Sequence, residues 1–346
     1  MSERRRVFSA SLGTATLFLL VQLGALALVE PFRAEGFQPV ENPSDPTNSI
    51  VYVALILVAT AGMLAVFRYG GQNVVRLTLI AVAGFISWYV FVVFLPTEPS
   101  AFGAALLPLA AALLVVVALY VHPEWYVIDG AGVIMGAGAA GLFGIGFGPL
   151  PALILLSVLA VYDAISVYGT EHMLTLAEGV MEMKVPVLLV IPTTLPFSFR
   201  DLAAEESSDD EAANPESVDE SANADDSDPD ESTDADASEG DAPGAESGPL
   251  ERDALFIGLG DAVIPTVLVA SAGAFLDAPP LVEGIALNAP ALGGMVGTMV
   301  GLAVLLRLVF DGRAHAGLPL LNTGAIVGYL VAVLATDVSL AAALGL

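Results

Sequence analysis

The sequence predicts an all-α membrane protein that crosses the bilayer many times. Of its 346 residues, 56% are hydrophobic and 14% are charged, which is far too apolar for a soluble chain of this length. The apolar residues gather in stretches of about 20, the length at which a helix spans a hydrocarbon core of about 30 Å. Because backbone polar groups in lipid must be bonded within their own segment, we expect these stretches to be helices.

Nine such stretches follow one another, and each is expected to form one transmembrane helix. They lie near residues 7–29, 50–68, 75–95, 101–121, 130–147, 149–169, 254–276, 290–310 and 317–336. The first has an arginine-rich head like that of a signal peptide. Its apolar run of about 23 residues is longer than a usual h-region, however, and no small-residue cleavage site follows. We therefore interpret it as the first membrane helix.

The basic residues orient these helices. With the N-terminus in the cytoplasm, ten of the eleven Lys and Arg residues fall on cytoplasmic flanks, and Arg33 alone falls outside. Lys and Arg collect in cytoplasmic loops of membrane proteins. The prediction is a multi-pass protein of the cell membrane, with its N-terminus cytoplasmic and its C-terminus outside.

Residues 170–199, between the sixth and seventh stretches, are not expected to cross the membrane. Residues 170–184 place apolar side chains on one helical face, which indicates an amphipathic helix at the membrane surface. Residues 185–199 are apolar but include three prolines over fifteen residues, and counting them as a span would move Arg307 and Arg313 outside. We interpret them as an interfacial or re-entrant segment.

An acidic loop follows, over residues 200–253. Residues 201–250 hold 19 of the 38 acidic residues and no Lys or Arg, and without them the formal charge falls from −27 to −8. Such a segment cannot bury a core and should be disordered. The predicted organisation is therefore helices one to six in residues 1–169, the interfacial segment in 170–199, the cytoplasmic loop in 200–253 and helices seven to nine in 254–346.

Composition also excludes several classes of function. The chain has no cysteine, so disulfides, thiolate metal sites and thiol nucleophiles are ruled out. The acidic balance argues against nucleic-acid binding, since little here could neutralise phosphates. The three histidines show no metal-ligand spacing, and we expect no metal and no cofactor. Acid excess with a single lysine is what we expect of a protein solvated in high salt, as in a halophilic archaeon.

Two aspartates lie inside predicted spans, where an ionisable residue is by default a candidate functional group. Asp163 lies about 9 Å from the cytoplasmic end of the sixth helix, and Asp261 about 10 Å into the seventh, at 1.5 Å per residue. Antiparallel helices would bring them to one depth. Two carboxylates at matched depth can share one proton and activate a water molecule.

The neighbouring residues are typical of an opened, wetted site. Gly258 and Gly260 remove side chains just before Asp261 and permit close approach of another backbone. Pro265 has no N–H for the Asp261 carbonyl, which softens the helix locally. Tyr162 could flank the site with its hydroxyl or simply pack.

These residues resemble a known family. Tyr162-Asp163, Gly258-Leu259-Gly260-Asp261 and a Leu318-Pro319 element at the ninth stretch are similar to motifs of the presenilin and signal peptide peptidase family of intramembrane aspartyl proteases. The resemblance covers essentially the whole chain and implies a presenilin-like fold of nine helices. It implies an intramembrane aspartic endopeptidase of the GxGD type that cuts peptide bonds within transmembrane segments, with Asp163 and Asp261 as the catalytic pair. The substrates would be single-span or signal-peptide-like membrane proteins in the lipid bilayer, and no obligate subunits are inferred.

The third motif departs from the family's Pro-Ala-Leu, because it reads Ala316-Gly317-Leu318-Pro319. The tripeptide is spelled at residues 151–153 and 290–292, but both copies start helices on the outer side, where proline is ordinary. The substrate-binding or supporting residues predicted from the motifs are Tyr162, Gly258, Leu259, Gly260, Gly317, Leu318 and Pro319.

Other functions remain open from the residues alone. An ion- or proton-conducting transporter or leak channel could use the same aspartates, although the inverted repeats and further midplane charges that it predicts are not found. A prepilin-type peptidase also uses a glycine-flanked aspartate, but nine spans and the late motif disfavour it. Asp129, Asp337 and Arg307 lie near predicted helix ends, and we interpret them as structural.

Overall fold

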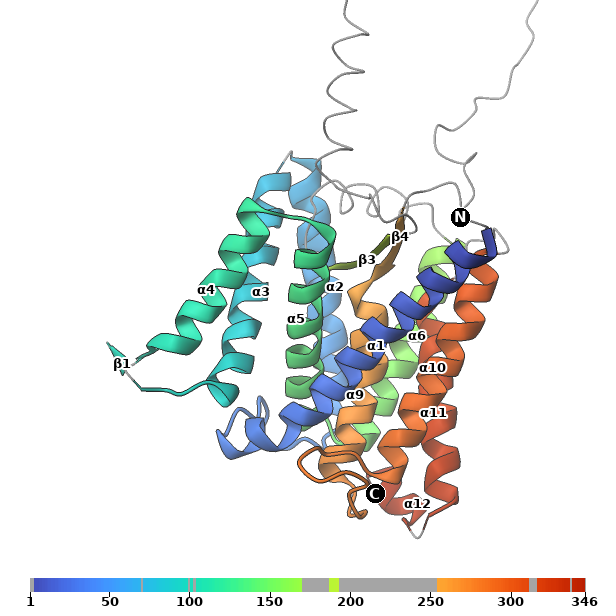
Figure 1. Cartoon of the computed structure of the whole chain (residues 1–346). Coiled ribbons are helices and arrows are strands. Elements are labelled where there is room, and N and C mark those ends of the chain that lie inside the picture. The colour runs from blue at the N-terminus through green and yellow to red at the C-terminus, as the bar shows by residue number, and fades with distance from the viewer. Residues whose placement is uncertain are drawn as a thin grey trace, which may run out of the picture.

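Long helices, lying side by side, make up most of the described chain (Figure 1). The computed structural model describes residues 3–69, 71–98, 100–101, 104–169, 187–192, 254–310, 316–336 and 338–345. The predicted amphipathic helix and the acidic loop lie outside these residues. The helices are α1 (Glu3–Ala34), α2 (Thr47–Arg68), α3 (Gln72–Phe94), α4 (Leu106–Val121), α5 (Trp125–Gly146), α6 (Pro149–Gly169), α9 (Leu259–Phe275), α10 (Ala289–Phe310), α11 (Gly317–Leu334) and α12 (Leu340–Ala343).

The predicted spans coincide with helices. Among the described residues, six helices are long and apolar enough to cross a membrane, namely α1, α3, α5, α6, α10 and α11, and three shorter apolar helices of 10–17 residues lie within α2, α4 and α9. The mostly helical, multi-pass architecture is thus confirmed, while the number of nine spans and their orientation stay predictions. Large apolar side chains such as Val58, Leu114 and Leu334 are at least two-thirds exposed, as lipid-facing positions require.

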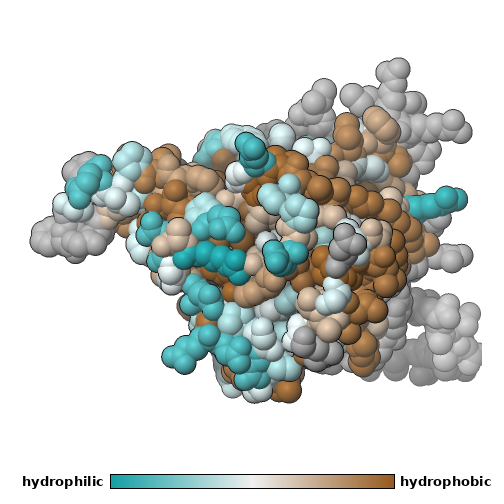
Figure 2. Space-filling model, turned by 90° about the horizontal axis from the view of Figure 1, so that it is seen from below, coloured by the Kyte–Doolittle hydropathy of each residue, from teal (hydrophilic) through white to brown (hydrophobic). Residues whose placement is uncertain are grey.

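Polar and apolar side chains are also separated on the surface of the molecule. Seen from the end that carries α12, hydrophilic side chains gather over the centre and one side of the view, and hydrophobic side chains cover much of the rest (Figure 2). A hydrophobic flank between polar ends is the surface expected of a protein that spans a bilayer.

Two predicted helical stretches begin with strands instead. The stretch predicted at 101–121 becomes helix at Leu106, after a short hairpin of β1 (Ser100–Ala101) and β2 (Ala104–Ala105). The stretch predicted at 254–276 becomes helix at Leu259, because residues 254–258 form β4 (Ala254–Gly258). The expected helical start at residue 254 was therefore wrong.

The partner of β4 is β3 (Leu188–Pro192), which falls within the segment predicted as interfacial or re-entrant. The two strands are antiparallel, with Leu188 opposite Gly258 and Val190 opposite Phe256. The pairing satisfies backbone groups that would otherwise be unbonded in an apolar setting. It also joins the two ends of the long acidic loop immediately before α9.

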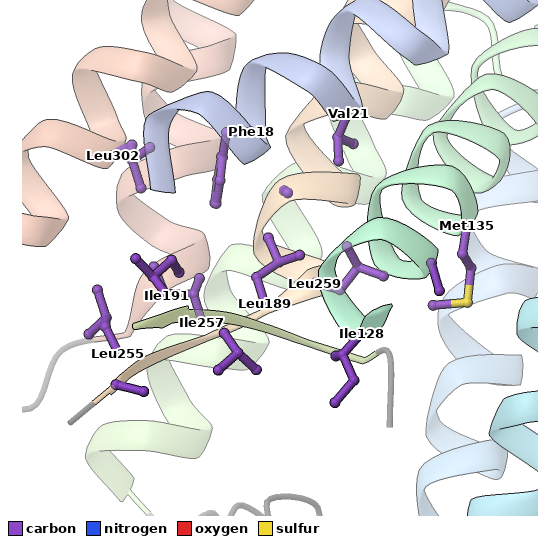
Figure 3. Packing of buried hydrophobic residues seen from close by; sticks show 14 of the residues in the cluster. Phe18, Val21, Ile128, Met135, Leu189, Ile191, Leu255, Ile257, Leu259 and Leu302 are labelled. Carbon is purple, nitrogen blue, oxygen red and sulfur yellow. The ribbon is translucent and has the colours of Figure 1, made fainter. Parts of the chain in front are cut away.

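The β3–β4 sheet is part of the core. Leu189, Val190 and Ile191 are at most 4% exposed. Figure 3 shows Leu189 and Ile191 on the side of the strands that faces Phe18 of α1. Both faces of the sheet are covered, so the sheet is buried within the helices.

The tightest helix contact joins α10 to α11. Glycines form this seam: Gly293, Gly297 and Gly301 of α10 lie against Gly324, Gly328 and the backbone of Leu320 in α11. A Cβ added at Gly301 would lie 2.6 Å from the Leu320 carbonyl oxygen, and one at Gly297 would lie 2.8 Å from the Gly324 carbonyl carbon. Small residues let helix backbones approach this closely in membranes, so α10 and α11 pack as one unit.

Candidate active site

Asp163 and Asp261 approach the same helix end from two different helices. Asp163 lies in the C-terminal half of α6, and Asp261 lies in the first turn of α9. Asp163 is 9% exposed, and Asp261 is partly buried. Because β4 occupies residues 254–258, Asp261 sits at the start of its helix and not two turns into it.

The shared helix end is the N-terminus of α11. The Leu318 N–H donates a hydrogen bond of 3.1 Å to Oδ2 of Asp163. A Cβ added to Gly317 would lie 2.9 Å from Oδ2 of Asp261, so the backbone of Gly317 lies directly against that carboxylate. Unpaired N–H groups at a helix N-terminus favour negative charge. The backbone of the first turn of α11 is thus in contact with both aspartates.

The two carboxylates border the same helix end, Asp163 at the Leu318 N–H and Asp261 at Gly317. Two like charges in a site of low dielectric cannot both be present cheaply. A pair of carboxyl groups at one helix end would therefore favour holding one proton between them.

The glycines around Asp261 differ in their surroundings. Gly258 is the N-cap residue of α9 and has extended backbone angles. A Cβ added to it would come within 3.7 Å of Oδ2 of Asp261. Gly260 is exposed, and no described atom lies within 4 Å of its added Cβ. Gly258 thus borders the carboxylate, while Gly260 has no described neighbour on its Cα side.

The remaining predicted residues lie nearby with weaker contacts. Tyr162 is 40% exposed, and Pro319 is partly buried in the first turn of α11. Leu259 is 4% exposed and lines a small apolar cavity of about 200 Å³ together with residues of α3 and α5.

The literal Pro-Ala-Leu sequences lie elsewhere. Residues 151–153 are in the first turn of α6, twelve residues and about 18 Å of helix before Asp163. Residues 290–292 are in the first turn of α10. Of the three proline-containing segments, Ala316–Pro319 is the one that the structure brings to the aspartates.

Asp129 of α5 was interpreted as a structural residue near a helix end, and the structure gives it a more specific place. It is 7% exposed, and its Oδ1 accepts a 2.7 Å hydrogen bond from the Val190 N–H of β3. An acidic residue in the first turns of an apolar helix was the sequence signal that could have singled it out.

The fold and these contacts define a class: a multi-pass helical membrane protein in which two aspartates from neighbouring helices meet within the apolar part of the molecule. A family model for signal-peptide peptidase and presenilin aspartyl proteases matches residues 15–338. The chain belongs to this family of intramembrane aspartyl proteases.

Solved structures agree with this membership. The chain is similar to two structures of a presenilin family intramembrane aspartate protease in different space groups, each at 32% sequence identity. The TM-scores are 0.60 and 0.58, with 94% of this chain covered in both, and 99% and 98% of the other chains. No match was found among the curated proteins.

Proposed function

We propose that Asp163 and Asp261 are the catalytic pair with which this chain hydrolyses peptide bonds inside transmembrane segments. The observation that carries the proposal is their convergence on the first turn of α11, where Leu318 donates to one carboxylate and Gly317 lies against the other. Family membership supplies the class of reaction.

In the proposed mechanism the aspartates divide the work. The ionised carboxylate takes a proton from a water molecule held between the pair, and the protonated partner donates a hydrogen bond to the scissile carbonyl. The water oxygen bonds to the carbonyl carbon, and the C–N bond breaks once the amine receives a proton. The donor from Leu318 keeps Asp163 oriented throughout.

The substrate must present an extended backbone to be cut, because a helical amide is shielded within its own turn. Gly258, Gly260 and Gly317 keep the space around Asp261 free of side chains for that backbone. The apolar cavity beside Leu259 would take one apolar side chain. Tyr162 and Pro319 border the same region and are proposed as supporting residues.

The substrates are proposed to be single-span or signal-peptide-like membrane proteins, reached through the lipid bilayer of the cell membrane. The arginine distribution supports a cytoplasmic N-terminus, and the three shorter apolar helices support nine spans in all. Because the natural chain lacks cysteine, single introduced cysteines labelled from either side of the membrane would test the topology directly.

The test of the catalytic pair is cleavage of a single-span reporter by purified protein in lipid vesicles at high salt. Asp163→Ala and Asp261→Ala should each abolish cleavage while both proteins still insert and fold. Asp277→Ala is the matched control, because Asp277 is an exposed carboxylate just beyond the far end of α9 and should leave the rate unchanged. Full activity of Asp261→Ala would end the proposal, and aspartate-dependent ion flux without cleavage would favour the conducting alternative.

A further inference from the structure

A buried carboxylate outside the proposed pair, Asp129, is bonded to the strand whose partner leads into α9. Asp129 lies one turn into α5, and its Oδ1 accepts the Val190 N–H at 2.7 Å. This bond joins residues 61 positions apart, and Val190 itself is 1% exposed. Without an acceptor on α5, this N–H would be buried and unbonded, which destabilises the folded state.

A short series of contacts connects this bond to Asp261. N–H groups along a strand alternate in direction, so an N–H of Val190 that reaches α5 points away from β4. Val190 is opposite Phe256 in β4, and β4 runs directly into α9. The first residue of α9 adds a second tie, because the Leu259 N–H donates to the Val187 carbonyl oxygen at 2.8 Å. Asp261 follows two residues later.

The sheet also meets α1, by apolar packing in which a Cβ added to Gly13 would lie 3.1 Å from Cγ2 of Ile191. Apolar packing is non-directional, whereas a short hydrogen bond to a carboxylate fixes one register. The bond from Val190 therefore sets how far the sheet, and with it the start of α9, slides along α5.

We infer that Asp129 is a positioning residue for the reaction: through β3 and β4 it fixes the place of the Asp261 carboxylate against the first turn of α11. The inference rests on the proposed catalytic role of Asp261. It assigns no contact between Asp129 and the substrate. It requires an acceptor oxygen at this position and does not require a negative charge.

The experiment compares two substitutions of one residue in the full chain, purified and reconstituted in lipid vesicles. Asp129→Asn keeps an acceptor oxygen and should keep the wild-type kcat for the single-span reporter. Asp129→Leu has similar size without an acceptor, and its kcat should fall by about 100-fold, the loss expected for a misplacement of about 1 Å, with little change in KM. Thr298→Val is the control, because it removes a buried hydrogen bond within α10 that is unconnected to the sheet and should leave kcat unchanged.

A second variant, which removes the donor of the same hydrogen bond, tests the inference if Asp129→Leu does not fold. Val190→Pro removes the donor from the same bond and leaves the ladder to β4 intact, since this N–H points away from it. If Asp129→Leu does not fold, Val190→Pro alone should show the fall in kcat. If both fold, the double variant should lose no more than either single variant, because the two remove one shared interaction.

The outcomes separate the two proposals. A wild-type protein that cleaves, with Asp129→Leu and Val190→Pro equally active, overturns the positioning role and leaves the catalytic pair standing. Equal losses in Asp129→Asn and Asp129→Leu show that charge matters instead of the acceptor, and this also overturns it. A wild-type protein with no cleavage defeats the proposed function and the inference together.

Discussion

Replacing Gly297 with alanine should destabilise the protein by separating α10 from α11. The added Cβ would overlap the Gly324 carbonyl oxygen and lie 2.8 Å from its carbon and 3.0 Å from Cα of Gly328. Carbon atoms in contact are normally about 3.5–4.0 Å apart, so the helices must move apart by about 1 Å. The obstructing atoms are backbone, which cannot turn aside as a side chain does.

The magnitude follows from two opposing terms. Overpacking of this kind costs about 1–3 kcal/mol, and rigid backbone on both sides places Gly297→Ala at the upper end. Alanine gains about 1 kcal/mol over glycine in helix propensity. The net loss is therefore about 2 kcal/mol, or roughly a 30-fold increase in the unfolding equilibrium constant.

The assay is equilibrium unfolding of the purified protein in lipid, with reporter cleavage measured beside it. Gly62→Ala in α2 is the matched control, because it makes the same chemical change where no described atom lies within 4 Å of the added Cβ, and it should be neutral or stabilising. Cleavage should fall in Gly297→Ala because α11 carries Gly317 and Leu318 to the aspartates. Equal stability of the two variants would refute the account of the glycine seam.

Three further outcomes follow from single contacts. Gly317→Val should abolish reporter cleavage with little loss of stability, because a side chain there would enter the space within 2.9 Å of the Asp261 carboxylate; an active variant would contradict the site. Asn288→Ala should lower the unfolding free energy by about 2 kcal/mol, because this buried side chain caps α10 and bonds a carbonyl of α9, and chemical denaturation measures it. The hydrogen bond from the Thr47 N–H lowers the pKa of Asp45 below 3.8. The stability that the ionised Asp45 contributes is therefore present above pH 3.8 and is lost as the pH falls through the lower folded pKa. In thermal melts, Asp45→Asn should lose less stability on acidification than the wild type.

The helices could be predicted because a membrane helix requires a long run of apolar residues, and such a run is visible in the sequence. A run of about 20 apolar residues has few alternatives in lipid. The two aspartates could be predicted for the same reason, since a carboxylate in such a run is costly. That Gly317 and Leu318 lie against the aspartates could be predicted only from the family resemblance.

The β3–β4 sheet could not be predicted from the pattern. Both faces of its strands are covered, so neither strand shows the alternation of apolar and polar residues that marks a half-buried strand. Residues 254–258 are as apolar as the helix that follows, and a short apolar run does not distinguish a strand from the start of a helix. The prolines near β3 also favoured an irregular segment.

The partner of Asp129 could not be predicted from a position near a helix end. Snorkelling works for Lys and Arg, whose long aliphatic stems reach the interface. Aspartate has one methylene and cannot do the same. A short acidic side chain in an apolar helix therefore calls for a partner inside the protein, here the Val190 N–H.

The contact between α11 and the aspartates has a consequence for how relatives of this chain are recognised. Leu318 contributes a backbone N–H, which any residue other than proline could supply, and Gly317 contributes the lack of a side chain. A consensus written as Pro-Ala-Leu selects residues 151–153 and 290–292 of this sequence and overlooks residues 316–318. Divergent members are better found by the local structure: a small residue, followed by a residue whose N–H lies in the first turn of the last long helix, with both of them next to the two aspartates.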